Sequence, residues 1–124
     1  MSAMINALNE QIKKEFYSAY MYLAMSAYFA DMGLPGFAAW MRVQAKEEVT
    51  HATKMYDYII SRGGRVDLKA IDQPPASWKN PLDVMQAALE HERYVTKCIS
   101  ELADLAVQEK AHATQIFLAW FVTE

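Results

Sequence analysis

The sequence is poor in the residues that mark several classes of protein. Cys98 is the single cysteine among 124 residues, so one chain cannot form an internal disulfide, and a Cys-x-x-Cys metal or redox module is excluded. No apolar run reaches the roughly 18 residues that a membrane span needs, and no signal-peptide pattern is visible. We therefore expect a cytoplasmic protein without a membrane partner.

An excess of positive charge is also missing. Twelve Lys and Arg residues stand against fifteen Asp and Glu residues, which gives a formal net charge of −3. A protein without a basic stripe is a poor ligand for nucleic acid, so no nucleic-acid partner is expected. An acidic balance suits the binding of cations. The 53% of apolar residues is ordinary for a globular protein, and we expect a single domain over residues 1–124.

Glycine and proline are few, four of each, and they interrupt the chain at only a few places. The stretches between them carry apolar residues at steps of three and four, which is the period of an amphipathic helix. The sequence therefore predicts an all-α fold. The expected helices cover about residues 4–31, 36–62, 81–107 and 111–124, and the fourth is much shorter than the others.

The connection between the second and third helices is long. The 18 residues of 63–80 include Pro74 and Pro75 and show no helical period. Extended, they reach up to roughly 60 Å, whereas each long helix measures roughly 40 Å. This segment can cross the whole bundle and place the third helix parallel to the second, as in ferritin-like four-helix bundles. A disordered linker is the alternative.

Acidic residues interrupt the apolar stripes of three different helices. Glu48 and His51 lie one turn apart on the stripe of the second helix. Glu15 is the one acidic residue on the stripe predicted for the first helix, which comprises Leu8, Ile12, Glu15, Ala19, Tyr22, Ser26 and Phe29. Glu92 is the one acidic residue on the stripe predicted for the third, which comprises Leu82, Met85, Leu89, Glu92, Thr96, Ile99, Ala103 and Ala106. A buried carboxylate costs several kcal/mol unless something compensates its charge. Glu48 and His51 alone could form a hydrogen-bonded pair. With Glu15 and Glu92 on inward faces as well, the pattern favours a site for two divalent metal ions.

Four blocks of the sequence resemble the non-haem bacterial ferritins, in the order that this family has them. They are residues 15–29, 47–51, 91–93 and 117–124, and the resemblance extends over essentially the whole chain. It implies a ferritin-like four-helix bundle and an iron-storage subunit. Such a subunit would act as a ferroxidase, an oxidoreductase that oxidises Fe(II) with dioxygen at a di-iron centre and passes Fe(III) to a mineral core.

The resemblance also implies roles for individual residues. Glu15, Glu48 and His51 are similar to the ligands of the first ferroxidase iron. Glu48 is similar to the carboxylate that bridges to a second iron, which Glu92 would also hold. The oligomer that the resemblance implies is a homo-oligomeric cage of 24 subunits.

Other residues resemble the surroundings of this centre. Glu47 and Glu124 are similar to carboxylates of a third iron site, and haem is not expected. Tyr22 resembles the tyrosine beside the di-iron centre and Trp120 a nearby aromatic residue. Either of them could donate an electron during oxygen chemistry.

The sequence departs from the family at one place. The family continues after the position of Glu124 with Gln-x-x-Glu and a short fifth helix, and this sequence has neither, so we expect a chain truncated within its fourth helix.

The alternative function is an iron-binding or structural cage subunit without efficient ferroxidase activity. A rubrerythrin-type peroxidase would need Cys-x-x-Cys, and a DNA-protecting mini-ferritin would place its ligands between subunits.

Overall fold

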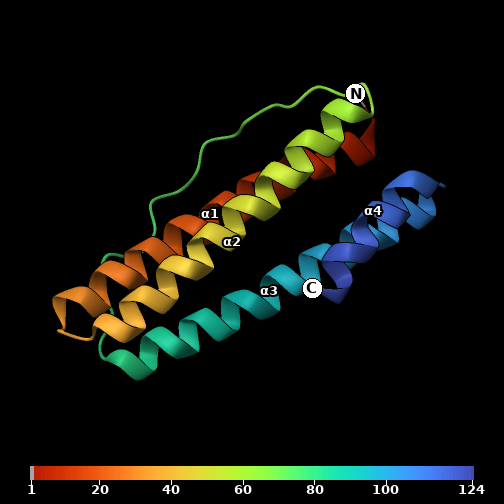
Figure 1. The fold of residues 1–124 in the computed structure, drawn as a ribbon. Coiled ribbons are helices and arrows are strands. Elements are labelled where there is room, and N and C mark those ends of the chain that lie inside the picture. The colour runs from red at the N-terminus through yellow and green to blue at the C-terminus, as the bar shows by residue number, and fades with distance from the viewer. Residues whose placement is uncertain (1) are drawn as a thin grey trace.

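The computed structural model describes residues 2–124, which form four α-helices and no strand (Figure 1). The helices are α1 (Ala3–Asp31), α2 (Pro35–Ser61), α3 (Pro81–Gln108) and α4 (His112–Thr123). Ser2 caps α1 by accepting the backbone N–H of Ile5 at 3.1 Å, and Asn80 caps α3 in the same way through Asp83 at 2.9 Å. In this part of the chain no helix is both long and apolar enough to cross a membrane.

The arrangement of the helices is that of a bundle with a crossover connection. A tight turn joins α1 to α2, and Gly33 adopts a φ of 73° there, a conformation that favours glycine. Figure 1 shows α1 and α2 as an antiparallel pair and the connector returning along their whole length. The third helix therefore starts at the same end as α2 and runs parallel to it, which confirms the predicted crossover. The fourth helix folds back along α3 and covers only part of its length.

The connector is held against the bundle mainly by Asn9 of α1. The Asn9 side chain donates to the carbonyl of Arg65 at 3.0 Å and accepts the backbone N–H of Asp67 at 2.8 Å. Further along, Trp78 packs edge to face on Tyr28, with ring centroids 5.7 Å apart. The hydrogen bonds of Asn9 satisfy backbone groups of a segment that has no regular structure of its own, and the ring of Trp78 anchors the far end of this segment on α1.

The apolar core is divided into two clusters by a polar layer. On α1, one cluster ends at Ile12 and the other begins at Met21, and on α2 they end and begin at Ala45 and Ala52. The layer between them holds Glu15 and Glu48. The stripe predicted for α1 is confirmed, since all seven of its residues are buried: Leu8, Ile12, Glu15, Ala19, Tyr22, Ser26 and Phe29.

The stripe predicted for α3 is wrong over its first half. Leu82 and Leu89 are 65% and 52% exposed, whereas Val84 and Ala88 are buried. Apolar residues occur on more than one side of α3, so its period does not define a single inward face.

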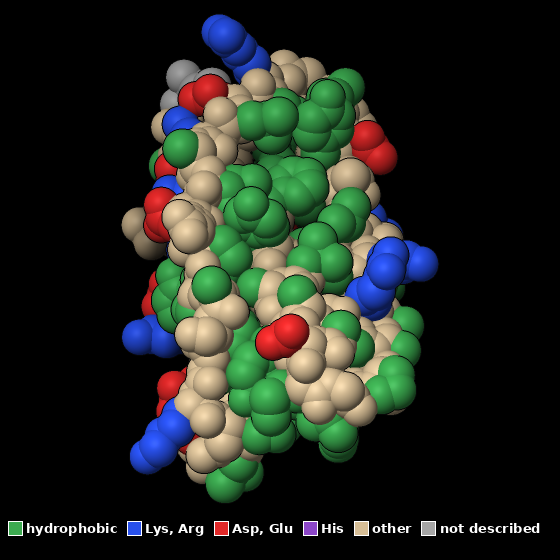
Figure 2. Space-filling model, turned by 90° about the vertical axis from the view of Figure 1, so that its left-hand side faces the viewer, with side chains coloured by type: hydrophobic (Ala, Val, Ile, Leu, Met, Phe, Trp, Pro, Cys, Tyr) green, Lys and Arg blue, Asp and Glu red, His purple; other side chains and the backbone are tan. Residues whose placement is uncertain are grey.

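Beside Met85 a hollow of about 610 Å³ is lined by apolar residues at the start of α2. Figure 2 shows hydrophobic side chains spread over the face at this end of the bundle, with charged groups mostly at its edges.

Candidate metal centre

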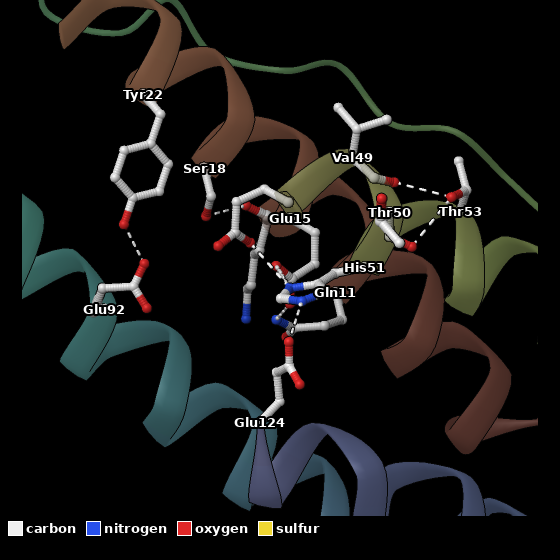
Figure 3. Close-up of polar contacts among 12 residues, drawn as sticks. Gln11, Glu15, Ser18, Tyr22, Val49, Thr50, His51, Thr53, Glu92 and Glu124 are labelled. Atoms are coloured by element: carbon white, nitrogen blue, oxygen red, sulfur yellow. Dashed lines mark hydrogen bonds and ion pairs between the residues drawn. The ribbon is translucent and has the colours of Figure 1, made fainter. Parts of the chain in front are cut away.

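Three potential ligands converge in the polar layer between the two apolar clusters. Glu15 comes from α1, and Glu48 and His51 come from α2, where a spacing of three residues places both side chains on one face. One ligand atom from each of the three lies within 4.8 Å of the other two. The Nδ1 atom of His51 is 3.4 Å from Glu48 Oε2 and 3.8 Å from Glu15 Oε2 (Figure 3). Two packed helices thus present a compact set of two oxygens and one nitrogen.

The two carboxylates are buried and incompletely satisfied. Glu15 is 1% exposed and Glu48 is 6% exposed. The Oε2 atoms of both residues are inaccessible to water and have no hydrogen-bond partner among residues 2–124. The other oxygen of Glu15 accepts a bond from Gln11 Nε2 at 3.3 Å. Buried carboxylate oxygens without donors are costly, and a bound cation is one way to compensate them.

The crowding of like charges changes how these groups hold protons. Burial raises the pKa of Glu48 to about 8, and the neighbouring Glu15 adds to that shift while His51 opposes it. The two carboxylates raise the pKa of His51 to about 10. Burial also acts to raise the pKa of Glu15, but its contacts with His51, Glu48 and Gln11 outweigh burial and leave that pKa below its ordinary value. Without a metal, the centre therefore retains protons at neutral pH.

The centre opens into a cavity of about 370 Å³ that the other predicted ligands also line. Glu47, Glu92 and Glu124 lie on its wall together with the three central residues. Glu124 comes closest, with its Oε1 atom 3.6 Å from His51 Nε2. Figure 3 shows it approaching the histidine from the side opposite to Glu15. The cavity therefore gathers five carboxylates and one imidazole from all four helices.

Glu92 is placed differently from the prediction. It lines the cavity, but its side chain is exposed rather than buried on an inward seam, and it is not part of the compact three-residue cluster. Its Oε1 atom accepts a hydrogen bond from the hydroxyl of Tyr22, which is 1% exposed (Figure 3). Burial and the Glu92 carboxylate both raise the pKa of Tyr22 above its ordinary value. Tyr22 is thus linked to the cavity by its hydrogen bond to Glu92, which lines the wall.

Several residues of this region were not found from the sequence. Gln11 is buried and supports Glu15 from one turn away, a position that the four-residue spacing could have revealed. Ser18 lies one turn on the other side of Glu15. Its hydroxyl donates to the carbonyl of Lys14 at 3.0 Å, so its oxygen can accept the Nε2 proton of His91, which lies 2.6 Å away. Burial lowers the pKa of His91, and no periodicity indicated this contact.

Aromatic rings cover the outer side of His51. The rings of Trp120 and Phe121 stand edge to face against the imidazole, with centroids 5.6 Å and 5.8 Å away. The ammonium group of Lys54, one turn after His51 on α2, lies 3.6 Å from the centroid of the Trp120 ring. The fourth helix therefore contributes both a carboxylate and an aromatic wall to the centre.

The donor set fits a hard or borderline divalent cation. Carboxylate oxygens favour hard cations, and one imidazole nitrogen widens the choice to iron, manganese or zinc. The Oε2 atoms of Glu15 and Glu48 have no hydrogen-bond partner among the described residues, and these two residues and His51 each offer a ligand atom within 4.8 Å of the others. The fold and this centre together define a class: four-helix bundles that bind metal in their core through carboxylates and histidine.

Comparison with known proteins narrows this class. Residues 5–124 match the ferritin-like domain family. The bacterial non-haem ferritin of Bacteroides fragilis is 50% identical over 119 residues, which are 96% of this chain and 75% of that protein. The corresponding ferritin of Staphylococcus haemolyticus is 39% identical over 121 residues, covering 98% of this chain and 73% of that protein. The chain belongs to the ferritin family of iron-storage proteins.

Solved structures agree with this assignment. The open-pore ferritin of the archaeon Archaeoglobus fulgidus superposes with a TM-score of 0.97 at 51% identity, covering 99% of this chain and 76% of that one. The ferritin of Chlorobium tepidum gives a TM-score of 0.96 at 35% identity, with the same coverage. The predicted all-α, ferritin-like bundle is therefore confirmed.

Proposed function

We propose that the chain is a cytoplasmic iron-storage subunit that binds Fe(II) at Glu15, Glu48 and His51 and oxidises it with dioxygen. The observation that carries this proposal is the pair of buried carboxylate oxygens without hydrogen-bond donors. They come from two helices, and together with an imidazole nitrogen they belong to a group of three residues whose ligand atoms lie within 4.8 Å of one another. Membership of the ferritin family identifies iron as the cation to test first.

The ligand chemistry favours oxidation. Hard oxygen donors stabilise Fe(III) over Fe(II), so a carboxylate-rich site makes loss of an electron easier. Two Fe(II) ions each lose one electron, and dioxygen accepts both together with two protons, which gives two Fe(III) and one hydrogen peroxide. The resulting Fe(III) then leaves for a mineral core inside a cage of identical subunits. The protein's own contribution is to hold the two ions close together within one subunit.

The remaining carboxylates supply further positions for iron. Glu92 lies on the same cavity wall and is the proposed ligand of the second ion, shared with Glu48. Glu47 and Glu124 are the proposed ligands of a third ion, and the approach of Glu124 to His51 supports a place near the first. Iron is the only cofactor or cargo in this proposal, which includes no haem.

The alternative function is an iron-binding or structural cage subunit without efficient ferroxidase activity. The first iron position has three buried or half-buried ligands on α1 and α2, whereas the carboxylates that only the further ions would use, Glu47, Glu92 and Glu124, are exposed. Tight binding of one Fe(II) per chain without rapid oxidation would favour this alternative.

Anaerobic titration with Fe(II), followed by calorimetry, tests the binding step. The parent chain should bind Fe(II), and Glu48→Gln should weaken binding at the tightest site by at least about tenfold, because it replaces a charged ligand by a neutral amide of the same shape. Glu90→Gln is the matched control, since Glu90 is an exposed carboxylate of α3 outside the cavity. Equal affinity in the parent and in Glu48→Gln would refute the assigned site.

A further inference from the structure

Lys54 is the residue next to the metal centre that the proposed reaction does not use. It lies on α2 one turn beyond His51, and its ammonium nitrogen sits 3.6 Å from the centroid of the Trp120 ring. The same indole stands edge to face against His51. A cation at this distance over an indole makes a direct cation–π contact. Lys54 therefore contacts Trp120, and Trp120 in turn contacts His51, the proposed iron ligand.

We propose that Lys54 protects Trp120 from oxidation by the chemistry at the neighbouring centre, and so leaves Tyr22 as the electron donor of the two aromatic residues. This inference rests on the proposed function, which places oxygen reduction beside both rings. Lys54 is a positioning residue in this account. It acts on the metal centre only through Trp120.

One-electron oxidation of the Trp120 indole creates a positive charge on the ring. When an indole gives one electron to an oxidant, it becomes a radical cation, which then loses its Nε1 proton to water. A positive charge above the ring repels the radical cation but is attracted by the neutral ring. Lys54 therefore makes the first electron harder to remove. The contact is partly open to solvent, since Trp120 is 38% exposed, so the effect is moderate rather than absolute.

Tyr22 has the opposite surroundings. Its hydroxyl donates a hydrogen bond to Glu92, so a carboxylate stands ready to take the phenolic proton when the ring loses an electron. A neighbouring negative charge and a proton acceptor both favour oxidation of a phenol. Tyr22 is also buried, which keeps the oxidised ring away from solvent. Tyr22 and Trp120 thus differ in the charge of their partners, which is a carboxylate for Tyr22 and an ammonium group for Trp120.

A one-electron oxidation of the iron-free protein tests this inference independently of ferroxidase activity. Azide radicals generated by radiolysis remove one electron from tryptophan and become azide anions, and mass spectrometry of peptides then measures the oxidised fraction at each tryptophan. Trp40 serves as the internal reference, because it is 51% exposed and makes no cation–π contact within residues 2–124. The quantity measured is the ratio of oxidation at Trp120 to oxidation at Trp40.

Lys54→Met should raise this ratio by roughly three- to tenfold, because Met keeps an unbranched chain over the ring and removes only the charge. Lys54→Arg should restore the parent ratio, since a guanidinium also stacks on an indole. Lys46→Met is the control on the same helix. Acrylamide quenching in a Trp40→Phe/Trp78→Phe background checks that the exposure of Trp120 is unchanged. The inference would be overturned if Lys54→Met had the same oxidation ratio as the parent. It would also be overturned if the ratio rose in Lys54→Arg as much as in Lys54→Met.

A second arm adds iron and dioxygen to the same variants. If Lys54 protects Trp120 during turnover, Lys54→Met should accumulate oxidised Trp120 under these conditions and the parent should not. A parent that binds no Fe(II) would refute the proposed function, yet the radical experiment on iron-free protein would still decide the effect of Lys54 on Trp120.

Discussion

Glu15, Glu48 and His51 are arranged in a way that does not serve stability in the metal-free chain. Two buried carboxylates lie side by side, and one oxygen of each has no donor. The single imidazole, whose Nδ1 atom lies 3.4 Å and 3.8 Å from these oxygens, balances the charge of one carboxylate, and Glu48 retains a proton at neutral pH. A pair of well-packed apolar residues would cost less at these positions. The arrangement therefore indicates selection for ligand binding rather than for folding.

Iron binding at this centre should release protons. Glu48, with a pKa of about 8, and His51, with a pKa of about 10, are both mainly protonated at pH 7 in the metal-free protein. Metal ligands must be deprotonated, so binding at pH 7 expels about one to two protons and the affinity falls as the pH is lowered. Calorimetry in two buffers with different ionisation enthalpies measures this release. Identical apparent enthalpies in both buffers would contradict the prediction.

The elements divide into a firmly held platform and a less completely covered half. The paired helices α1 and α2 carry the compact ligand set, and each contributes buried residues to both apolar clusters, α1 from Met4 to Phe29 and α2 from Ala38 to Ile59. By contrast, α3 leaves Leu82 and Leu89 exposed beside the hollow at the start of α2. The first metal position therefore depends on the best packed pair of helices.

Asn9 of α1 supplies side-chain hydrogen bonds that hold the start of the crossover connector. Asn9→Ala would remove the part-buried hydrogen bonds to the backbone of Arg65 and Asp67. We expect a loss of about 1–3 kcal/mol in the free energy of unfolding and faster tryptic cleavage at Arg65 and Lys69. Urea denaturation and limited proteolysis measure the two effects. Asn6→Ala, an exposed change on the same helix, should alter neither, and equal behaviour of both variants would argue against this role.

Periodicity predicted some elements better than others. The stripe of α1 could be predicted completely because its apolar residues occupy a single face, and the predicted helix ranges differ from the observed bounds by at most one residue. The buried face of α3 could not be predicted, because Leu82, Val84 and Leu89 give that helix apolar residues on several sides. Which side is buried depends on the packing of α1 and α4 against it, and local sequence does not encode that.

For the molecule as a whole, the length of the 63–80 segment was enough to predict the crossover. A connector able to span the bundle admits a parallel third helix, and the fold confirms it. The grouping of Glu15, Glu48 and His51 could be expected from their places on two stripes. The contacts of Glu124 with His51 and of Tyr22 with Glu92 join different helices, so only the assembled bundle reveals them.

Assembly into a cage of identical subunits is a prediction that the resemblance to ferritins carries. The single-chain structure adds that large apolar side chains such as Phe37 and Trp40 remain on its surface, 48% and 51% exposed. Their place is near the α1–α2 turn, distant from the carboxylate layer along the helix axes. The chemistry at the centre should thus be measurable whatever the state of assembly.

Oxygen-dependent oxidation of about two Fe(II) ions per chain, followed optically, tests whether Glu15, Glu48 and His51 form a ferroxidase centre. Fe(III) should form faster than in buffer alone, and the rate should fall to the buffer value in Glu48→Ala, with Glu90→Gln behaving like the parent. A parent chain no faster than buffer, or a Glu48→Ala variant as fast as the parent, would contradict this assignment.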